Sequence, residues 1–446
     1  MRRIYRRLLQ FSSLVVFLAT APLMVFYAMG YRLSPKSIDP LPVGALMIES
    51  IPRHAHISIN GRGAGITPKS IANLTPGKVS ITVSKQGYGE WHKEFSIEPT
   101  AVTEARSIRL FPIQPHMQVM LRQSKIFSLA PNRHLLAVLA ADGRLHILDD
   151  EGEAITDPLR IDHPADEIFW SSDSGNLLLL GPRSTQLVQL TKLRAGGRVL
   201  PSLQKAQDIV WDPRIPGRLL VLNQENVLVA HNIDTQQRVP LIADVKAFAT
   251  SSRHIYAVNN SGILTIHDLQ GRVIRTLPIA LEKPAAKLHV TPAGRVAIEF
   301  ADHGVAVVND RDELRIITDK KVETVSWSPD GQLLLLQVEP TALYVYNAAD
   351  ERPPYVPLDE LQLIVRLSRP IHTPQWFAGS RHLIYQSDDE IIITEIDTRD
   401  HPVMYTVDAT NLGEALVTVG RNGEVLYYLK RTDSSTDLIA TSLLAE

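Results

Sequence analysis

Three short stretches contain residue types that could support metal or phosphate chemistry. His54 and His56 alternate along the chain, which would place two imidazoles on one face of a strand, with His92 as the nearest further histidine. The acidic run Asp388–Glu390 has the oxygen ligands that calcium prefers. The glycine-rich run at 61–65, GRGAG, would let a phosphate approach the backbone closely.

None of these stretches completes a site. The two histidines lack a nearby third ligand, so we interpret them as solvent-facing strand residues. The acidic run lacks the calcium-loop spacing with its central glycine, and no helix is predicted after GRGAG to present its N-terminus to a phosphate. The sequence therefore predicts no catalytic residue, no metal ligand and no cofactor site, and it leaves the residues of any binding site undetermined.

Composition excludes several further classes of protein. The chain has 446 residues and Cys 0, which excludes disulfides, thiolate metal sites and cysteine nucleophiles. Lys+Arg 46 against Asp+Glu 48, with 6% aromatic residues, gives no basic stripe with interleaved aromatic residues, so we expect no nucleic-acid partner. The length allows several domains.

The N-terminus has the pattern of a membrane anchor. Residues 1–10 contain four arginines and no acid, and residues 11–31 contain no aspartate, glutamate, lysine, arginine or histidine. A helix over 11–31 would span about 30 Å, the thickness of a hydrocarbon core. The excess of arginine before the segment predicts a single-pass anchor in the cell membrane, with a cytoplasmic basic tail and an extracytoplasmic C-terminal part.

A cleaved signal peptide is the alternative for the same segment. Its apolar region would be shorter, about 7–15 residues, and would end in a small-x-small site. Ala28-Met29-Gly30 matches that site poorly because the bulky Tyr31 follows. We therefore favour an uncleaved signal anchor, although the sequence leaves cleavage open.

Residues 32–112 predict a linker followed by a small β domain. Residues 32–42 contain three prolines and indicate an extended linker. Residues 43–112 consist of short alternating apolar and polar runs with turn signals between them, and Asn60-Gly61 is the strongest hairpin signal. We expect five or six strands in a small antiparallel sandwich.

This segment, 43–112, resembles the PEGA domain family through a series of ordered motifs. They are Ser50-Ile-Pro52, Ile57-Ser-Ile-Asn-Gly61, Gly65-Ile-Thr-Pro68, Leu74-Thr-Pro-Gly77 and Gly87-Tyr88. The tetrapeptide that names the family is replaced by Pro52-Arg-His-Ala55, so one turn departs from the pattern. The resemblance implies a non-catalytic β module that makes contacts in envelope and surface proteins.

The remaining residues, 113–446, repeat one pattern eight times. Trp327-Ser-Pro-Asp-Gly331 followed by QLLLLQ is the clearest copy, and the period is about 41 residues. Each copy begins with a large residue, which we expect to pack between neighbouring sheets: Leu129, Trp170, Trp211, Phe248, Val290, Trp327, Trp376 and Val419. Three to four strands per copy predict an all-β propeller, with eight blades favoured and seven possible.

The two ends of the repeat region suggest how the ring closes. The third strand of the last copy ends close to Glu446, so no residues remain there for a fourth strand. The segment 116–122, HMQVMLR, precedes the first copy and has no unit of its own. We expect this segment to complete the last blade, which would remove an open sheet edge.

The repeats are similar to those of TolB-type and WD-repeat propellers, through Trp-Ser-Pro-Asp-Gly and its partial copies. The resemblance implies a rigid disc whose channel mouth or rim binds proteins, peptides or glycans. The Trp-Asp dipeptide that ends the third strand of a blade in regular WD repeats is absent from that position in these copies. Ser171–Gly175 resembles the Asp-box turn of sialidases, but Leu178 stands where an aromatic residue should follow, so we interpret it as a hairpin turn.

The leading hypothesis is a non-catalytic scaffold or binding protein, anchored in the membrane of a prokaryotic cell envelope and contacting an envelope protein, peptide or glycan. One alternative is a membrane-tethered enzyme with its active site in the propeller channel, which convergent ionisable groups with shifted pKa values would favour. No Gly-x-Ser-x-Gly motif is present to support a hydrolase. Another alternative is a wall-contact protein in which the PEGA-like module binds and the propeller acts as a spacer.

Overall fold

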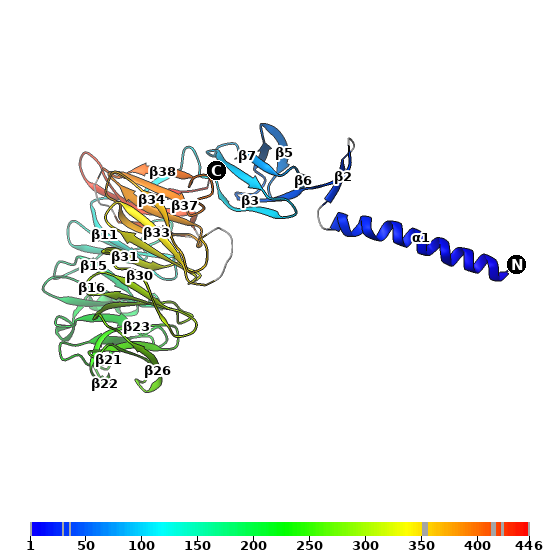
Figure 1. Ribbon diagram of the computed structural model, residues 1–446. Helices are drawn as coiled ribbons and strands as arrows, with labels where there is room; N and C mark the ends of the chain where they lie inside the picture. The colour runs from blue at the N-terminus through cyan, green and yellow to red at the C-terminus, as the bar shows by residue number, and fades with distance from the viewer. Residues whose placement is uncertain are drawn as a thin grey trace. The chain divides into compact units, whose positions relative to one another are not determined.

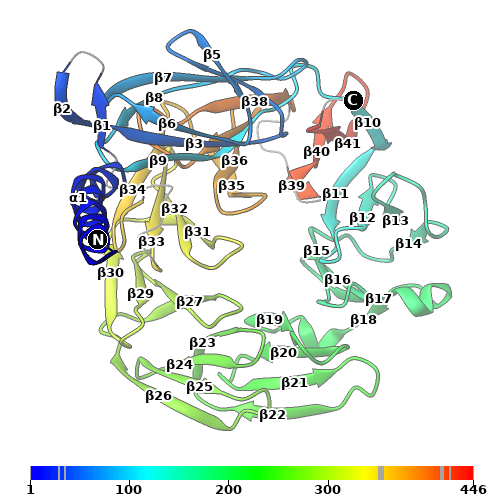
Figure 2. The same ribbon diagram turned by 90° about the vertical axis from the view of Figure 1, so that its right-hand side faces the viewer.

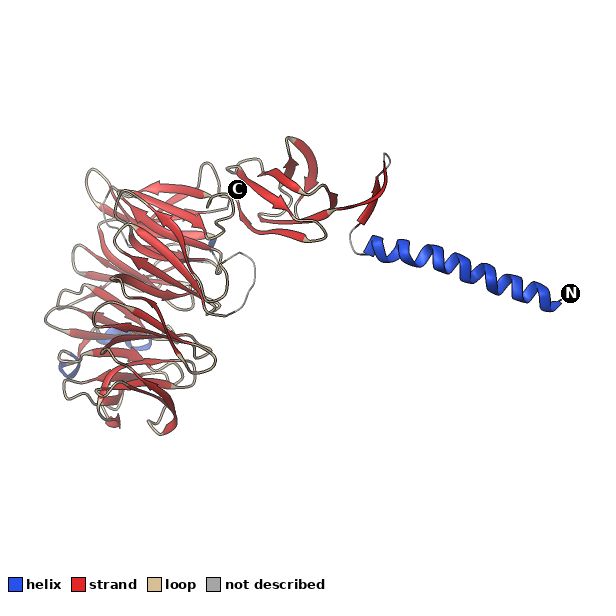
Figure 3. Cartoon of the chain, in the orientation of Figure 1, coloured by secondary structure: helices blue, strands red, loops and turns tan. Residues whose placement is uncertain are grey.

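The computed structural model describes residues 2–28, 31–34, 37–349, 356–411, 416–420 and 423–444. Most regular structure among these residues is β-strand (Figure 3). The chain forms two compact units. The first comprises the residues up to Gln114 together with Thr398–Val403, and the second comprises Pro115–Asp397 and Met404–Leu444.

Helix α1 (Arg2–Ala28) contains most of the expected anchor segment, whose residues 29 and 30 lie outside the described residues (Figure 1). The Thr20 hydroxyl donates to the Val16 carbonyl at 2.8 Å. Large apolar side chains along the helix are exposed: Phe11, Leu14, Val15, Val16, Phe17, Leu18, Met24 and Val25. Among the described residues, no helix combines the length and the mean hydropathy needed to cross a membrane.

The segment expected to be a single extended linker folds back on itself. Strand β1 (Tyr31–Ser34) pairs antiparallel with β2 (Ser37–Pro42), and Tyr31 lies opposite Pro42. Proline lacks an N–H donor, yet a two-stranded ribbon tolerates it because each strand keeps one unpaired edge. The pairing brings Tyr31, the last residue of the expected anchor segment, next to the start of the small β unit.

The small β unit contains two sheets. One has the order β5-β4-β7-β8 and the other has the order β6-β3-β9. The strands are β3 (Gly44–Ile51), β4 (His56–Ile59), β5 (Arg62–Ile66), β6 (Lys69–Leu74), β7 (Gly77–Ser84), β8 (Trp91–Ile97) and β9 (Val102–Arg109).

The expectation of five or six antiparallel strands was wrong on both counts. There are seven strands within the described part of this unit, and β3 pairs with β9 in parallel. These strands open and close the unit, and a parallel pair requires a long crossover, which here runs through the other sheet.

Turn residues and the alternation of buried and exposed side chains account for the β-sandwich. Asn60 (φ 48°) and Gly61 (φ 76°) both adopt the left-handed region, as the predicted two-residue hairpin requires. Side chains of β8 alternate strictly between buried and exposed, and Trp91 and Phe95 lie in the core. Within the same compact unit, the Arg399 guanidinium lies 4.3 Å from the centroid of the Phe95 ring, and Val403 packs against the core.

The second unit is built from four-stranded antiparallel sheets, eight of which occur within its described residues. Figure 2 shows them following one another around a ring, with β15, β19, β27 and β31 near the centre and β13, β22 and β26 toward the outside. The first four in chain order are β11 (Ser124–Leu129), β12 (Leu135–Ala140), β13 (Arg144–Asp149), β14 (Leu159–Arg160); β15 (Glu167–Trp170), β16 (Asn176–Leu180), β17 (Thr185–Gln189), β18 (Arg198–Val199); β19 (Asp208–Trp211), β20 (Arg218–Leu222), β21 (Leu228–Asn232), β22 (Arg238–Ile242); and β23 (Val245–Thr250), β24 (Ile255–Asn259), β25 (Ile263–His267), β26 (Val273–Ala280).

The next three sheets repeat the arrangement, and the last sheet combines one strand from the start of the repeat region with three strands from its end. Two short 3-10 helices, Leu190–Ala195 and Pro201–Leu203, flank β18 of the second sheet. The strands are β27 (Ala285–Val290), β28 (Val296–Phe300), β29 (Val305–Val308), β30 (Leu314–Thr318); β31 (Val322–Trp327), β32 (Leu333–Val338), β33 (Ala342–Asn347), β34 (Leu361–Arg366); β35 (His372–Phe377), β36 (His382–Ser387), β37 (Glu390–Glu395), β38 (Met404–Ala409); and β39 (Val417–Gly420), β40 (Val425–Arg431), β41 (Thr436–Ser442), β10 (Met117–Leu121).

The expected closure is confirmed. Strand β10 pairs antiparallel with β41, with Gln118 opposite Ala440. A further hydrogen bond supports the pairing of β10 with β41, because the Gln123 backbone N–H donates to Asp437 Oδ1 at 3.0 Å. The start of the repeat region therefore supplies the outer strand of its last sheet.

The repeated motif works as expected at the hairpin turns. In the clearest copy, the Gly331 N–H donates to the Ser328 carbonyl at 2.8 Å, and Gly331 adopts a φ of 69°. The Ser328 hydroxyl donates to Asp330 Oδ1 at 2.6 Å, which fixes the turn. Strand β32, which follows, is buried at every position, as a strand between two neighbouring sheets requires.

Four tryptophans connect neighbouring sheets by the same hydrogen bond. Each indole N–H donates to the backbone carbonyl of the residue just before the corresponding large residue of the previous copy. The pairs are Trp170 with Ser128 (3.0 Å), Trp211 with Phe169 (3.3 Å), Trp327 with His289 (2.8 Å) and Trp376 with Ser326 (3.0 Å). Three of these rings are buried as expected, but Trp327 is only half-buried.

Replacing these tryptophans should destabilise the propeller according to their burial. Trp211, 5% exposed, should cost about 3–5 kcal/mol as Trp211→Ala, and the half-buried Trp327 should cost about 2 kcal/mol as Trp327→Ala. Trp211→Phe keeps most of the volume but loses the indole donor, and should cost about 1 kcal/mol. Chemical denaturation measures these differences, with Trp91→Phe in the small β unit as the control. Equal costs at Trp211 and Trp327 would contradict the packing argument.

Removing β10 should open the ring. A fragment beginning at Ser124 lacks the strand that covers β41, and should lose several kcal/mol of stability relative to a fragment beginning at Phe111. Thermal melting of the two fragments checks this expectation. Indistinguishable melting temperatures would show that β10 does not contribute to closure.

Candidate functional site

The connectivity of the sheets gives the ring two distinct faces. Neighbouring strands are antiparallel, so loops joining first to second and third to fourth strands emerge on one face. We call it the turn-motif face, because the Ser328–Gly331 turn lies there. Loops joining second to third strands, and one sheet to the next, emerge on the other face, which we call the closure face.

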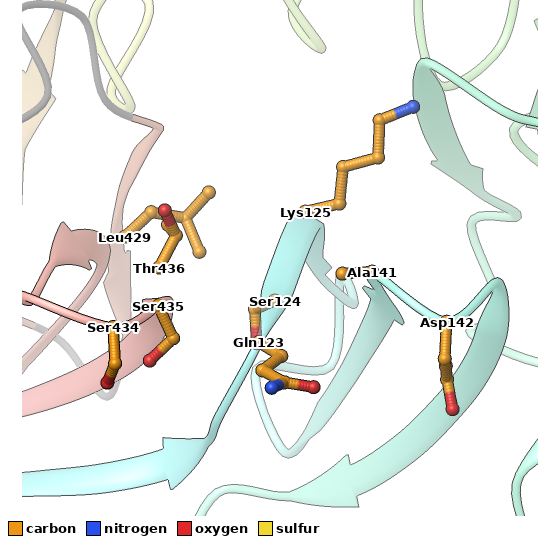
Figure 4. Close-up of a pocket in the computed structure, with 9 residues that line it drawn as sticks. All are labelled: Gln123, Ser124, Lys125, Ala141, Asp142, Leu429, Ser434, Ser435 and Thr436. Atoms are coloured by element: carbon orange, nitrogen blue, oxygen red, sulfur yellow. The ribbon is translucent and has the colours of Figure 1, made fainter.

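A pocket of about 710 Å³ opens on the closure face between the first and last sheets (Figure 4). We call it the closure pocket. One wall comes from the start of β11 and the β12–β13 loop, and the opposite wall comes from β40 and the β40–β41 loop. Its lining residues are Gln123, Ser124, Lys125, Ala141, Asp142, Leu429, Ser434, Ser435 and Thr436.

Two hydroxyl groups of this pocket are held by hydrogen bonds within the protein. Ser124 donates to the Leu121 carbonyl at 3.0 Å, and Ser435 donates to Asp437 Oδ1 at 2.6 Å. Asp437 also accepts the Gln123 N–H that joins the ring. No histidine lines the pocket to act as a general base for these hydroxyls. The pocket therefore presents hydroxyl, amide, carboxylate and ammonium groups above the apolar Leu429.

Repeated β-bulges shape the same face. The inner strands β11, β23, β27, β31 and β35 each shift register near their first residues, at the end on the closure face. Bulges redirect side chains, and they are common at barrel rims and beside binding sites. The bulged residues are exposed: Lys125, Lys246, Ala286, Glu323 and Thr373.

One carboxyl group at the start of an inner strand has a shifted pKa. Burial raises the pKa of Asp208, and the Lys287 ammonium opposes this shift. Asp208 begins β19 and Lys287 lies on β27, two inner strands separated by another sheet.

One histidine–carboxylate pair lies on the inner part of a sheet. His289 Nε2 is 3.1 Å from Glu299 Oε2, and this hydrogen bond holds the pKa of Glu299 below its ordinary value. Both side chains are mostly buried, at 15% and 22% exposure. The carboxylate of Glu299 orients the imidazole of His289, as in a general base. Neither residue lines the closure pocket or the second pocket described next.

A second pocket, of about 490 Å³, opens on the turn-motif face. Tyr256, Ile266 and Leu277 contribute to its lining, together with loops that contain Arg295 and Asp310. Arg275 forms an ion pair with Asp312 at the same pocket. Because Arg275 and Asp312 neutralise each other, this pocket has less unpaired charge than the number of charged residues in its lining would give.

The candidate metal residues of the sequence do not come together. Among the described residues, no group of three histidine, aspartate or glutamate side chains could hold a metal ion. His54 has a φ of 60° in a bend before β4, so it does not share a strand face with His56. His92 Nδ1 lies 3.1 Å from Thr82 Oγ1.

The other candidate motifs have structural partners. Arg369 pairs with Asp388, and its guanidinium lies 3.9 Å from Glu390, so a cation of the chain itself faces the acidic run. Ser171–Gly175 forms the β15–β16 turn, where Asp173 accepts a bond from Ser171. The glycines at 61–65 lie in the β4–β5 hairpin.

The sequence analysis missed the closure pocket. Its main signal was the polar run Thr432–Thr436 within the last copy, which consists of hydroxyl residues and one aspartate. Gln123, the other indicator, adopts a φ of 53° at the turn into β11. These residues lie more than 300 positions apart, and pairing of β10 with β41 brings them together.

Comparisons with known proteins agree with the two-part fold. Residues 43–110 match the PEGA domain family, which confirms that resemblance. No curated protein matches the chain. Among solved structures, the crystal structure of the C-terminal WD40 domain of Sif2 is similar, with a TM-score of 0.50 and 10% identity over 73% of this chain and 98% of that one.

Two other solved propellers align less closely. Hsv2 of Kluyveromyces lactis has a TM-score of 0.46 and 11% identity, over 64% of this chain and 98% of that one. The Cps50 (Swd1) β-propeller domain of Myceliophteria thermophila has a TM-score of 0.42 and 13% identity, over 74% and 100%. The likeness to the Sif2 domain shows the propeller fold and nothing about the ligand.

The His289–Glu299 pair should make stability depend on pH. Because the pKa of Glu299 is depressed in the folded state, the pair stabilises above the unfolded pKa of about 4.3, and this stability is lost as pH falls through the folded pKa. Glu299→Gln cannot ionise. Between about pH 6 and about pH 3, the wild type should therefore lose more unfolding free energy than this variant. Denaturation at several pH values measures it; Glu225→Gln is the control, and parallel profiles for wild type and Glu299→Gln would refute the coupling.

Proposed function

We propose that this protein is a non-catalytic binding scaffold of a prokaryotic cell envelope, held in the cell membrane by residues 11–31. Its extracytoplasmic part would consist of the PEGA domain and an eight-bladed, TolB-type propeller. The closure pocket and the surrounding bulges would contact an envelope protein, peptide or glycan. The closure pocket is the observation that carries the binding proposal.

Membrane anchoring is supported by α1. Its exposed side chains between Phe11 and Val25 include eight large apolar ones, and no acidic residue lies in its first turn. An exposed apolar surface of this extent needs a non-aqueous environment or a partner. The four arginines at 2, 3, 6 and 7 support a cytoplasmic N-terminus.

Binding by the propeller is supported by the groups in the closure pocket. Its lining offers donors, acceptors and charges of both signs together with two apolar residues, a composition typical of recognition surfaces. The loops that form it belong to rigid sheets, so its shape is fixed before a partner arrives. The fold alone is compatible with many ligands.

The enzyme alternative has two observations in its favour, the His289–Glu299 pair and the raised pKa of Asp208. A base also needs a nucleophile or a substrate pocket within hydrogen-bonding reach. The lining of neither pocket includes His289 or Glu299. We therefore favour the scaffold.

Single cysteines provide a direct test, because the natural chain has none. In intact spheroplasts, a membrane-impermeant maleimide should label Ser434→Cys at the closure pocket and should leave Gln10→Cys, in the basic tail, unlabelled. The same Ser434→Cys position, carrying a photo-crosslinker, should capture a defined partner. Asp244→Cys, exposed in a loop of another sheet, serves as the matched surface control.

Each part of the proposal can fail separately. Labelling of Gln10→Cys but not of Ser434→Cys would reverse the topology. Equal capture from Ser434 and from Asp244 would show that the closure pocket is not the binding site.

A further inference from the structure

The inner turns of the propeller carry a recurrent cation. On the turn-motif face, each loop that joins a first strand to a second strand lies toward the centre of the ring, because the first strands are innermost (Figure 2). Five of these loops in the described chain contain an arginine: Arg133, Arg214, Arg253, Arg295 and Arg381. Tight turns favour glycine, proline and short polar residues. Turn formation therefore does not explain the recurrent arginine.

Three of these arginines lie on consecutive sheets and have no acidic partner. We call Arg214, Arg253 and Arg295, on the third, fourth and fifth sheets, the arginine arc. Arg214 and Arg253 are exposed and Arg295 is partly buried, and none of them forms an ion pair with another described residue. The acidic residue of these three loops is Asp212, which pairs with Arg218 and is 1% exposed. The arc therefore presents uncompensated positive charge.

Hydrogen bonds between neighbouring sheets hold the turns of the arc in place. They run from Ser172 Oγ to the Asp212 carbonyl (3.3 Å), from Arg218 Nη2 to the Leu269 carbonyl (2.9 Å), from Ser252 Oγ to the Pro292 carbonyl (3.1 Å) and from Arg295 Nη1 to the Gly331 carbonyl (3.4 Å). These bonds link the second to the sixth sheet. The backbone of the arc is therefore ordered before a partner binds, which lowers the entropy cost of binding.

The positive charge does not continue outward from the arc. The loops that join third to fourth strands of the same three sheets contain Asp234, Asp268, Asp310, Asp312 and Glu313. Nearby cations pair with three of these acids: Lys192 with Asp234, Arg272 with Asp268, and Arg275 with Asp312. The outer loops therefore add no net positive charge. A long polyanion would gain little by extending across them, whereas a short acidic segment would meet the arc alone.

The second pocket adjoins the arc through Arg295. Apolar side chains form part of its lining: Tyr256, Ile266, Leu277, Val296 and Val308. Asp310 and Asp330 also line it, so the pocket itself disfavours a carboxylate. A volume of about 490 Å³ with these groups fits an apolar side chain. A ligand that fills both places must combine carboxylates with an apolar group, as a polypeptide does and polyphosphate does not.

From these observations we infer that the arginine arc and the second pocket bind an acidic peptide segment of a partner protein. Carboxylates of the segment pair with the guanidinium groups, whose planar donors match a carboxylate. An apolar side chain of the same segment enters the second pocket. The site lies on the face opposite the closure pocket, so the inference goes beyond the proposed function and does not depend on it.

Fluorescence polarisation tests the inference with the full chain in micelles of a non-ionic detergent. The probe is a dye-labelled peptide in which glutamates flank one leucine, and the same peptide with glutamines is the control. The formal net charge of -2 gives the chain no general attraction for an acidic peptide. We expect affinity for the glutamate peptide to fall as salt rises, and the glutamine peptide to bind at least about tenfold more weakly. Equal binding of the two peptides would overturn the inference.

Charge reversal locates the site. Arg214→Glu with Arg253→Glu should weaken binding of the glutamate peptide at least about tenfold, because repulsion replaces each ion pair. The milder Arg214→Gln with Arg253→Gln should weaken it at least about threefold and guards against a folding artefact. The matched control is Lys246→Glu with Lys287→Glu, on the inner strands β23 and β27 near the closure face, which should leave binding unchanged. Equal losses in the arginine and lysine variants would overturn the location.

The apolar contact and the class of ligand are tested separately. Replacing the leucine of the probe by serine should weaken binding at least about fivefold, and no change would overturn the role of the second pocket. Inorganic polyphosphate should compete poorly; competition as strong as that of the unlabelled peptide would identify a general anion site instead. A maleimide adduct on Ser434→Cys, in the closure pocket, should leave binding unchanged, and loss of binding would place the peptide on the opposite face.

Discussion

Closure of the ring is the constraint on which the rest of the propeller depends. Pairing β10 with β41 brings together residues separated by roughly 320 positions, which costs about 5 kcal/mol in chain entropy. The packing of sheet against sheet offsets this cost only when every sheet has two neighbours. The indole bonds from Trp170, Trp211, Trp327 and Trp376 give that packing a fixed register, because each donor reaches one particular carbonyl of the previous sheet.

A rigid ring separates the residues that fold the protein from those available for recognition. The middle strands are buried between neighbours, and their residues contribute packing energy. The loops on the closure face are not needed for that packing and can carry other chemistry. The closure pocket combines both roles, because Asp437 accepts the bond from Gln123 that joins the ring and also holds the Ser435 hydroxyl at the pocket wall.

The small β unit is organised by different physics. Its core is a compact apolar cluster that includes Trp91, formed between a four-stranded and a three-stranded sheet. No ring is closed here, because the two sheets cover each other's apolar faces directly.

Periodicity and turn chemistry alone determined the repeat, the three to four strands per copy and the closing role of segment 116–122. These features follow from local rules. Gly331 and Gly61 have positive φ angles in tight turns, and the alternation of side chains sets which face of a strand is buried. Only the tertiary structure decided the parallel pairing of β3 with β9, the pairing of residues 31–34 with residues 37–42, the partial exposure of Trp327, and the closure pocket. Each of these features depends on which distant segments become neighbours. A pattern of residue types along the chain does not reveal contacts between distant residues such as Gln123 and Asp437.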